Sequence, residues 1–143
     1  MILDIVYKNE KEISLPDLEA LFQSVGWLSA DYPNRLGRAI RQSATVITAW
    51  DSGRLVGLIN ALDDGELTAY IHYLLVHPDY QQQGIGTQLL NRMKSFYETY
   101  LYIIIIAENK PLVPFYLRAG FSAQEEAITM AIISKSTEQK LNS

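Results

Sequence analysis

Apolar positions in the first part of the chain repeat with two different periods, which predict one strand and two short helices. Residues 2–7 alternate in polarity and predict a short strand. Ser14 is a suitable N-cap for the helix that follows, and Gly26 is a suitable end for it. A second short helix is expected over residues 36–44. Residues 27–34 between the helices show no clear period, which predicts a loop.

Three segments rich in apolar and β-branched residues come next, and turn sequences separate them. We expect strands over residues 45–50, 55–62 and 67–76. Asp-Ser-Gly at 51–53 and Asp-Asp-Gly at 63–65 are typical turn sequences. The short spacing between the segments favours antiparallel hairpins.

A helix and a fourth apolar strand follow these hairpins. From Gly84 onward, one face of the predicted helix is apolar, with Ile85, Leu89, Met93, Phe96 and Tyr97. Residues 102–107 then form a continuous apolar run, which predicts a strand covered on both faces. Because a helix separates this strand from residues 67–76, we expect the two strands to be parallel, with a right-handed crossover.

The last part of the chain predicts a short helix over residues 109–119 and a final strand over residues 127–133. Residues 134–143 are polar and are expected to form a frayed tail. No linker or repeat interrupts the sequence, so residues 1–143 are interpreted as a single domain. Hairpins followed by one β-α-β unit predict an α/β fold with a mixed, mostly antiparallel sheet flanked by helices.

The loop between residues 67–76 and the helix at Gly84 carries the pattern Gln81-x-x-Gly84-x-Gly86. A strand, a glycine loop and a helix N-terminus in this order present unpaired N–H groups, which favour an anion such as a phosphate. The loop is not a Walker sequence, because threonine and glutamine follow Gly86. It is not the dinucleotide fingerprint either, because Leu89 stands where the third glycine is needed.

Composition narrows the chemistry further. The chain has no cysteine, which excludes disulfides, thiolate metal sites and a cysteine nucleophile. With only two histidines, we expect no metal site. A net charge of −4 makes nucleic acid a poor partner. The sequence contains neither the features of a signal peptide nor an apolar run long enough to span a membrane, so a cytoplasmic location without membrane association is the expectation.

Two sequence blocks resemble the GCN5-related N-acetyltransferase (GNAT) superfamily. The glycine loop above matches that family's Gln/Arg-x-x-Gly-x-Gly/Ala pattern, and a typical Val76-His77-Pro78 precedes it. The second block of the family, Asn-x-x-small-x-x-Phe-Tyr-x-x-x-Gly-Phe, is matched by Asn109, Phe115, Tyr116, Gly120 and Phe121. Leu112 stands at the small position, which is a mild departure. Both blocks lie within residues 67–121, at the separation typical of the family.

The resemblance implies that acetyl-coenzyme A (acetyl-CoA) is the acetyl donor. By analogy, the loop residues that hold its pyrophosphate are Gln81, Gln82, Gln83, Gly84, Ile85, Gly86 and Thr87. The backbone of Leu74, Leu75 and Val76 would pair with pantetheine, although their side chains are interpreted as ordinary buried strand residues. Asn109 would contact the cofactor, or it simply caps a helix. Many relatives have arginine at the Gln81 position, so one cation is missing here.

The reaction implied is acetyl transfer to a primary amine. An alkyl ammonium must lose a proton before it attacks, and the departing thiolate needs a donor. Tyr116 matches the family's usual thiolate donor. Many relatives carry a glutamate near the His72 position; His72 could act as the general base, directly or through water, or it could be a sheet histidine without a catalytic role. Without cysteine, no acetyl-cysteine intermediate forms, so we expect direct attack in a ternary complex.

The acetyl acceptor is the least defined part of the prediction. Trp27, Asp31 and Tyr32 could hold a cationic amine of a small molecule or a protein, or they belong to a solvated loop. The hairpin at Asp63 and Asp64 is a second candidate region. A non-catalytic acyl-CoA sensor of the same fold is the alternative function, and relatives of this family often form homodimers.

Overall fold

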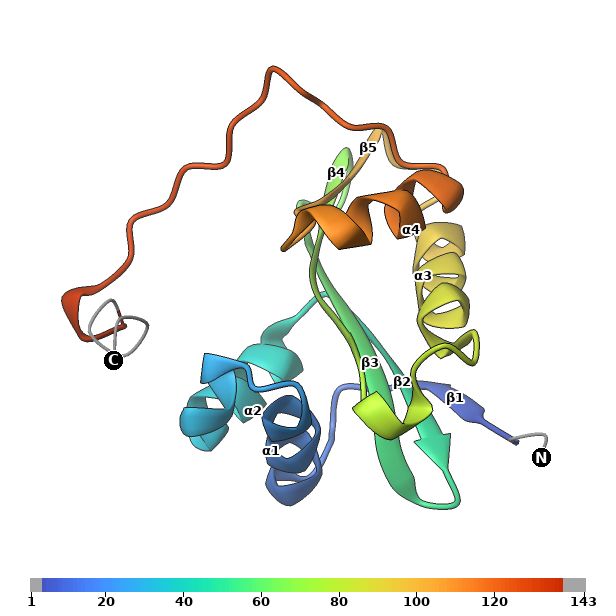
Figure 1. The fold of residues 1–143 in the computed structure, drawn as a ribbon, viewed down its shortest axis with the longest axis vertical. Coiled ribbons are helices and arrows are strands. Elements are labelled where there is room, and N and C mark those ends of the chain that lie inside the picture. Colours follow the sequence, from blue (N-terminus) through green and yellow to red (C-terminus); the bar gives the residue numbers. More distant parts are fainter. Residues whose placement is uncertain (1–3, 138–143) are drawn as a thin grey trace. The chain divides into compact units, whose positions relative to one another are not determined.

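A computed structural model describes residues 4–137 of the 143-residue chain. Its contacts divide the chain into two compact units, Met1–Ala107 and Glu108–Ser143, which we call unit 1 and unit 2. The interpretation of residues 1–143 as a single domain stays a prediction. Unit 1 contains β1 (Val6–Asn9), α1 (Leu15–Ser24), η1 (Leu28–Asp31), α2 (Pro33–Gln42), β2 (Thr45–Asp51), β3 (Arg54–Asp63), β4 (Thr68–Val76), η2 (Pro78–Tyr80), α3 (Ile85–Phe96) and β5 (Tyr102–Ile105), as drawn in Figure 1.

The five strands form one sheet in the order β1-β2-β3-β4-β5. Neighbours from β1 to β4 are antiparallel, and tight turns join β2 to β3 and β3 to β4. β4 and β5 are parallel, as a connection through α3 requires, and their ladder runs from Thr68–Tyr102 to Ile71–Ile105. The mixed α/β sheet predicted from the sequence is confirmed.

Helices α1 and α2 pack together on one face of the sheet. Ser14 caps α1 by accepting a hydrogen bond from the Asp17 N–H, as its position in the sequence predicted. The apolar sides of both helices meet β2, β3 and β4 in a buried core that includes Leu18, Leu21, Phe22, Leu36, Ile40, Val46, Leu58 and Leu75. The three arginines of α2 (Arg35, Arg38 and Arg41) are exposed.

Helix α3 packs closely on the sheet at Gly57 of β3. A Cβ built on Gly57 would lie 3.1 Å from Leu89 and 3.3 Å from Ile85, which are both buried residues of α3. Glycine therefore lets the first turns of α3 approach the strand more closely than a larger residue would. Since α3 follows the glycine loop directly, this contact also fixes where that loop ends.

A buried polar cluster holds the far end of α3 against the sheet. The Tyr97 hydroxyl donates to Asp63 Oδ2 at 2.6 Å and lies 2.8 Å from Thr45 Oγ1. Burial, together with the hydrogen bond to Asp63, raises the pKa of Tyr97 to about 12, so its phenol stays protonated and can donate. Asp63, at the end of β3, is thereby tied to the end of α3.

Replacing Tyr97 by phenylalanine should lower the free energy of unfolding by about 2 kcal/mol, because Thr45 and Asp63 each lose a buried partner. Chemical denaturation monitored by circular dichroism measures this loss. Tyr100→Phe is the matched control, since Tyr100 contacts the Tyr97 ring edge-on and the ring is kept. An equal loss in both variants would show that the hydrogen bonds of Tyr97 are not the cause.

Several element boundaries differ from the sequence prediction. The first strand covers Val6–Asn9 and not residues 2–7, because its ladder with β2 begins at Val6; residues 2 and 3 lie outside the described part of the chain. Residues 27–34 are not a plain loop: η1 occupies their middle, and Pro33 begins α2. Proline is well suited to a first helical position, since the missing N–H would have no helical partner.

β5 was predicted to be covered on both faces, and this is wrong for part of the strand. It ends at Ile105, and Tyr102 and Ile104 are 61% and 47% exposed. β5 is the last strand in the sheet order, so within residues 4–137 only one edge of it is paired. A continuous apolar sequence cannot distinguish such an edge strand from a central one.

Unit 2 contains η3 (Lys110–Leu112) and α4 (Val113–Arg118), so the short helix predicted over residues 109–119 is split in two. The strand predicted over residues 127–133 is wrong, because the described residues pair it with no other strand. Ile128, Met130 and Ile132 are 83%, 89% and 102% exposed there. β-branched residues favour a strand only when a partner strand is present. Of the predicted frayed tail, residues 138–143 lie outside the described residues.

Candidate active site

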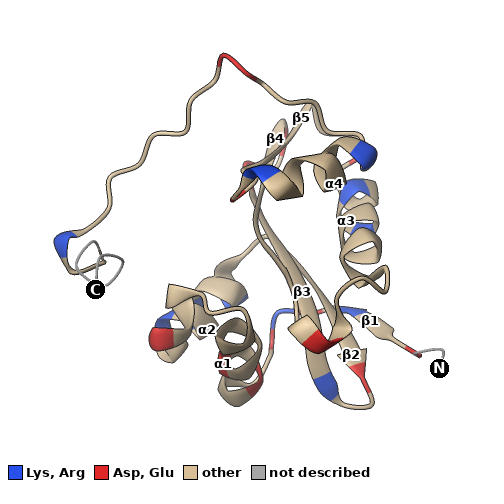
Figure 2. Cartoon of the chain, viewed as in Figure 1, with Lys and Arg blue, Asp and Glu red and all other residues tan. Residues whose placement is uncertain are grey.

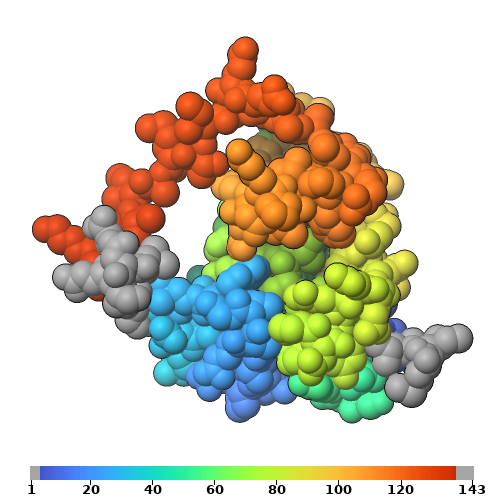
Figure 3. Space-filling view, viewed as in Figure 1, coloured from blue at the N-terminus to red at the C-terminus, as the bar shows by residue number. Residues whose placement is uncertain are grey.

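The loop after β4 leads directly into the N-terminus of α3, as the sequence predicted. Gln81, Gln82, Gln83 and Gly84 are exposed, and Figure 3 shows this yellow-green segment on the molecular surface. Gln82 and Gly84 have positive φ angles of 62° and 85°. The Gln81 side chain donates from Nε2 to the Val76 carbonyl at 3.0 Å, which ties the loop back to the end of β4.

The N-terminus of α3 is open. Gly84 is its N-cap, and no side chain caps the helix. A Cβ built on Gly84 would meet nothing within 4 Å, so the space beside Gly84 is open. Ile85 is buried and offers only its backbone there, whereas Gly86 is partly exposed and Thr87 is exposed. Uncapped N–H groups, helix dipole and free space together fit an anionic group such as a pyrophosphate.

The other side of the same loop is anchored to the hairpin of β2 and β3. The Tyr80 hydroxyl donates to Asp51 Oδ2 at 2.5 Å, and the Arg54 guanidinium lies over the Tyr80 ring. Arg54 Nη2 is also 3.1 Å from His77 Nε2. His77 accepts from the Asp79 N–H and so caps η2, in line with its interpretation as a loop residue.

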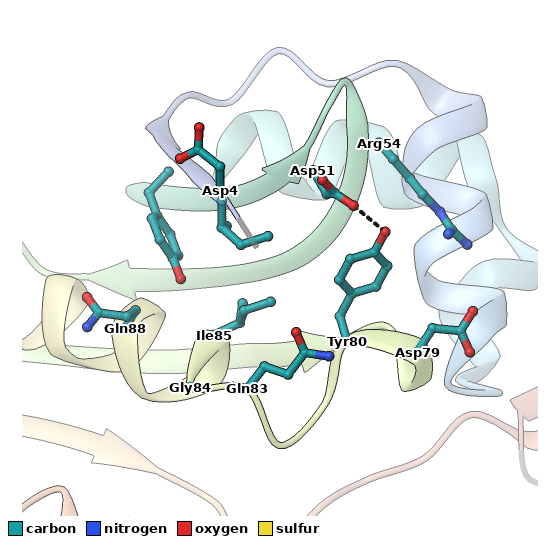
Figure 4. Close-up of a pocket in the computed structure, with 11 residues that line it drawn as sticks. Asp4, Asp51, Arg54, Asp79, Tyr80, Gln83, Gly84, Ile85 and Gln88 are labelled. Carbon is teal, nitrogen blue, oxygen red and sulfur yellow. Dashed lines mark hydrogen bonds between the residues drawn. The ribbon is translucent and has the colours of Figure 1, made fainter. Parts of the chain in front are cut away.

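A hollow of about 890 Å³ lies beside this anchor, as Figure 4 shows. Its wall includes Asp4, Ile5, Tyr7, Asp51, Arg54, Asp79, Tyr80, Gln83, Gly84, Ile85 and Gln88. Three carboxylates against one guanidinium make this wall unsuitable for a phosphate. Gln83, Gly84 and Ile85 border the hollow, so an anion at the N-terminus of α3 would have to lie away from its carboxylates. Trp27, Asp31 and Tyr32 do not line it.

β4 continues beyond its pairing with β5. Their ladder ends at Ile71–Ile105, and the rest of β4, which includes Leu74, Leu75 and Val76, extends past it. On its other edge this stretch remains paired with β3. Leu75 is buried, as expected for an ordinary strand side chain. The backbone on the β5 side of this stretch has no partner in that ladder, as binding an extended ligand requires.

His72 belongs to an aromatic row on β4. Its ring stacks on Tyr73 at a centroid distance of 4.0 Å and on Tyr70 at 5.7 Å. Although more than a third of His72 is exposed, desolvation by its surroundings lowers its pKa below the ordinary 6.5. The imidazole is therefore neutral at pH 7 and able to accept a proton.

The aromatic row brings one predicted acceptor residue close to His72. Trp27 lies 5.7 Å from the Tyr73 ring, and the Ser29 hydroxyl of η1 is 2.7 Å from the Tyr73 hydroxyl. Asp31 is exposed, and Tyr32 packs its ring under the Arg35 guanidinium. The structure thus joins Trp27 to the row.

Asp63 and Asp64, the carboxylates of the β3–β4 hairpin, stabilise the local structure through hydrogen bonds. Asp64 Oδ1 accepts from the N–H groups of Glu66, Leu67 and Thr68, and these hydrogen bonds lower the pKa of Asp64. Asp63 is held by Tyr97 and by the Gly65 N–H. Both side chains already have partners, which makes the hairpin a poor candidate for amine binding.

Tyr116 and Asn109 lie in unit 2 and are described within it. The Tyr116 ring makes edge contacts with Phe115 and Phe121, which are neighbours in its sequence block. Burial, together with the charge of Glu108, raises the pKa of Tyr116 to about 12. Asn109 Oδ1 accepts from the Leu112 N–H and caps η3, so its helix-capping interpretation is confirmed.

Sequence reasoning missed Tyr70, Tyr73 and Ser29 as candidate site residues. Tyr73 follows His72 directly, and in a regular strand the two would point to opposite faces. Only the register of β4 against β3 reveals that they share one face, and no feature of the sequence alone carries that register. Within residues 4–137, no cluster of His, Asp or Glu is placed to hold a metal ion. No helix in that part of the chain is long and apolar enough to cross a membrane.

Comparison with known proteins places the chain in a family. A model of the acetyltransferase (GNAT) family matches residues 12–121. An uncharacterised N-acetyltransferase, ycf52, of Porphyra purpurea is 28% identical over 87% of this chain and 74% of its own length. The GCN5-related N-acetyltransferase 2 of Arabidopsis thaliana, named as chloroplastic, is 25% identical over 90% of this chain and 57% of its own length.

A solved structure agrees with these relatives. A GNAT family acetyltransferase from Streptococcus pneumoniae TIGR4 superimposes with a TM-score of 0.80 at 28% identity, covering 92% of this chain and 99% of its own. The family-model match spans β2 to β5, the glycine loop and α3, which are the elements that build the site above. The chain therefore belongs to the acetyltransferase (GNAT) family and is an acetyltransferase enzyme.

Proposed function

We propose that the protein transfers an acetyl group from acetyl-CoA to a primary amine by direct attack in a ternary complex. The observation that carries this proposal is the N-terminus of α3, where Gly84 is the N-cap and no side chain caps the helix. The glycine loop joins this helix end to β4, which extends beyond its pairing with the parallel strand β5. An anion-binding helix end and a free strand edge suit the pyrophosphate and the pantetheine of one ligand. Acetyl-CoA supplies the acetyl thioester.

The loop binds this ligand chiefly through its backbone. Gln82 to Thr87 offer N–H groups to the pyrophosphate, and Gly84 and Gly86 keep side chains out of its way. Gln81 is already used to tie the loop to the Val76 carbonyl, so it acts by holding the loop and not as a counter-charge. Because relatives with arginine at this position have an extra cation, we expect only moderate affinity for acetyl-CoA.

His72 acts as the general base in this proposal. An alkyl ammonium is protonated at pH 7, whereas the lowered pKa of His72 keeps the imidazole ready to accept a proton, directly or through water. As the amine nitrogen forms its bond to the acetyl carbon, the C–S bond breaks. The amine gives up its protons through His72 to solvent, and the sulfur departs as a thiolate that takes up one proton from solvent to become the free thiol.

Tyr116 stabilises the departing thiolate as a hydrogen-bond donor. A thiol has a pKa near 8.5, well below the value of about 12 for Tyr116. Complete transfer of the phenol proton to sulfur is therefore unfavourable, and the hydrogen bond itself is the contribution. Stabilisation of developing charge by one positioned donor is worth about 2–4 kcal/mol.

Tyr116→Phe should lower kcat by about 100-fold and leave the Kd of acetyl-CoA within about threefold of its original value, because only the charge that develops on sulfur loses its donor. Thiol release under saturating amine measures kcat, and calorimetry measures Kd. Phe115→Leu is the matched control, since it changes the ring beside Tyr116 and keeps the phenol. A Tyr116→Phe variant with full kcat would contradict the assignment.

Calorimetry with acetyl-CoA, followed by thiol release with a panel of primary amines, tests the proposed function. We expect binding and thiol release with at least one amine. Binding without thiol release for every amine would favour the alternative, a non-catalytic acyl-CoA sensor. Absence of binding would contradict both readings.

The acceptor is proposed to be a primary amine of a small molecule or a protein. Trp27 contributes to the aromatic row beside His72, and a cation can bind over such rings. Asp31 and Tyr32 remain proposed contacts from the neighbouring segment. The net charge of −4 suits a cationic acceptor, and neither nucleic acid nor membrane is proposed as a partner. Figure 2 shows acidic and basic positions spread over the elements of unit 1.

A cytoplasmic location is proposed from the sequence, although two relatives are named as chloroplastic. Imaging of the full chain with a C-terminal fluorescent tag in its source cells distinguishes the two compartments. Fluorescence confined to an organelle would contradict the proposal.

A homodimer is proposed because residues 127–133 expose alternating apolar side chains, which a second chain could cover. Sedimentation of the full chain should give twice the mass of one chain. Replacing Ile128, Met130 and Ile132 by threonine should shift it to a monomer, and a monomeric parent protein would contradict the idea.

A further inference from the structure

β4 contains a bulge at the aromatic row. Ile59 of β3 pairs with Leu74, but Ala61 pairs with Ile71. One residue of β3, Asn60, therefore lies opposite two residues of β4, His72 and Tyr73. The extra residue interrupts the ladder at this point.

The bulge explains why His72 and Tyr73 act together. Consecutive side chains of a regular strand point to opposite faces, so neighbouring rings do not stack. Here the rings of His72 and Tyr73 lie 4.0 Å apart with an interplanar angle of 22°. The Tyr70 ring also stacks on the His72 ring, at a centroid distance of 5.7 Å. The bulge thus places Tyr70, His72 and Tyr73 on one face.

The Asn60 side chain occupies the interruption. A bulge leaves a ladder N–H without its strand partner, and the Tyr73 N–H donates instead to Asn60 Oδ1 at 2.7 Å. Asn60 Nδ2 donates to Ser43 Oγ at 3.0 Å, and Ser43 Oγ donates to the Ala39 carbonyl of α2 at 2.9 Å. Asn60 and Ser43 are 2% and 1% exposed. Both ends of the Asn60 amide are therefore fixed within the core.

We propose that Asn60 is a positioning residue for the acetyl acceptor: it holds the bulge of β4 and so keeps His72 and Tyr73 on the face that receives the amine. This inference rests on the proposed function, because it gives the aromatic row a role in catalysis. An apolar side chain at position 60 leaves the Tyr73 N–H without an acceptor, and removing the bulge restores a regular ladder. Because strand side chains repeat every two residues, that change moves His72 or Tyr73 to the opposite face.

The test compares Asn60→Leu, which removes the acceptor for the Tyr73 N–H at similar volume, with Asn60→Asp, which keeps it. Asn60→Leu should raise the KM of the amine and lower kcat, each about tenfold or more. The Kd of acetyl-CoA should stay within about threefold, because the loop lies beyond the bulge. Asn60→Asp should recover most of kcat/KM. Thr45→Val is the matched control: it loses a buried hydrogen bond to Tyr97 and should keep both constants.

Nuclear Overhauser contacts between the His72 and Tyr73 rings give a readout that does not depend on activity. The parent protein and Thr45→Val should show them, and Asn60→Leu should lose them. Contacts retained in Asn60→Leu, or kcat/KM within twofold of the parent, would overturn the proposal. If Asn60→Leu fails to fold, the Asn60→Asp variant decides. Loss of the ring contacts in Asn60→Asp, or their absence in the parent protein, would overturn the proposal. Ring contacts retained in Asn60→Asp together with recovered kcat/KM would support it. If the parent releases no thiol, the proposed function fails, and the ring contacts still test Asn60.

Discussion

Replacing His72 by glutamine should lower kcat/KM for the amine by 100-fold or more at pH 7, since a positioned general base contributes about 100- to 10,000-fold. The glutamine amide fills similar space and keeps a polar group beside Tyr70 and Tyr73, but it cannot take a proton. The change therefore isolates proton transfer from packing. Thiol release under subsaturating amine measures the loss.

The pH dependence of kcat/KM provides the sharper test. In the parent enzyme, neutral His72 is the active form, and its pKa lies below 6.5 because of desolvation. The rate should therefore stay level from neutral pH down to that pKa and fall as His72 becomes protonated. Without a base, only the free amine reacts, so kcat/KM of His72→Gln should rise about tenfold per pH unit up to the amine pKa near 10.

The second histidine of the chain supplies the control. His77→Asn keeps a side-chain acceptor for the Asp79 N–H and so preserves the cap of η2. The fall of kcat/KM at acidic pH, which is the acidic limb of the pH profile, should persist in this variant. If His72→Gln kept that limb unchanged, His72 would be a sheet histidine without a catalytic role.

The parts of the site that could be predicted from sequence are those in which the chain order alone determines the geometry. Ser14 caps α1, and the apolar stripe from Ile85 to Met93 forms α3 as expected. The loop from Gln81 to Thr87 must lie at the end of a helix, because strand, glycine and helix follow one another directly. These features depend on neighbours within a few residues, and local propensity controls them.

The remaining features depend on residues that are distant in sequence. His72 and Tyr73 share a face only because the Asn60 side chain replaces a ladder hydrogen bond. Tyr80 anchors the loop through Asp51, which belongs to the β2–β3 hairpin. Residues 127–133 have the composition of a strand, but the described chain provides no pairing for them. Register and pairing partners are properties of the assembled sheet, so a pattern read along one segment cannot supply them.

Thr87→Glu should lower the affinity for acetyl-CoA by about 30-fold or more and should not destabilise the fold. Thr87 is the third residue of α3 after the N-cap Gly84, and its side chain is exposed. A glutamate at this position reaches back to the N–H groups at the start of its own helix. Its negative charge also interacts favourably with the helix dipole, which is worth about 0.3–1 kcal/mol.

The predicted loss of affinity has the same physical origin as the gain in stability. The carboxylate of the new glutamate occupies the N–H groups that the pyrophosphate needs, and two like charges about 4 Å apart near a protein surface repel by about 4 kcal/mol. Calorimetry measures Kd, and thermal unfolding without ligand measures stability. Affinity and stability should therefore move in opposite directions in a single variant.

Gln88→Glu is the control for net charge. It adds the same charge to the first turns of α3, but the Gln88 N–H already bonds to the Gly84 carbonyl within the helix, and its side chain lines the hollow beside Tyr80. We expect its Kd for acetyl-CoA to rise less than fivefold. Added salt should narrow the gap between Thr87→Glu and the parent, since screening weakens repulsion between exposed charges. If Thr87→Glu bound acetyl-CoA as tightly as Gln88→Glu, the N-terminus of α3 would not be where the pyrophosphate lies.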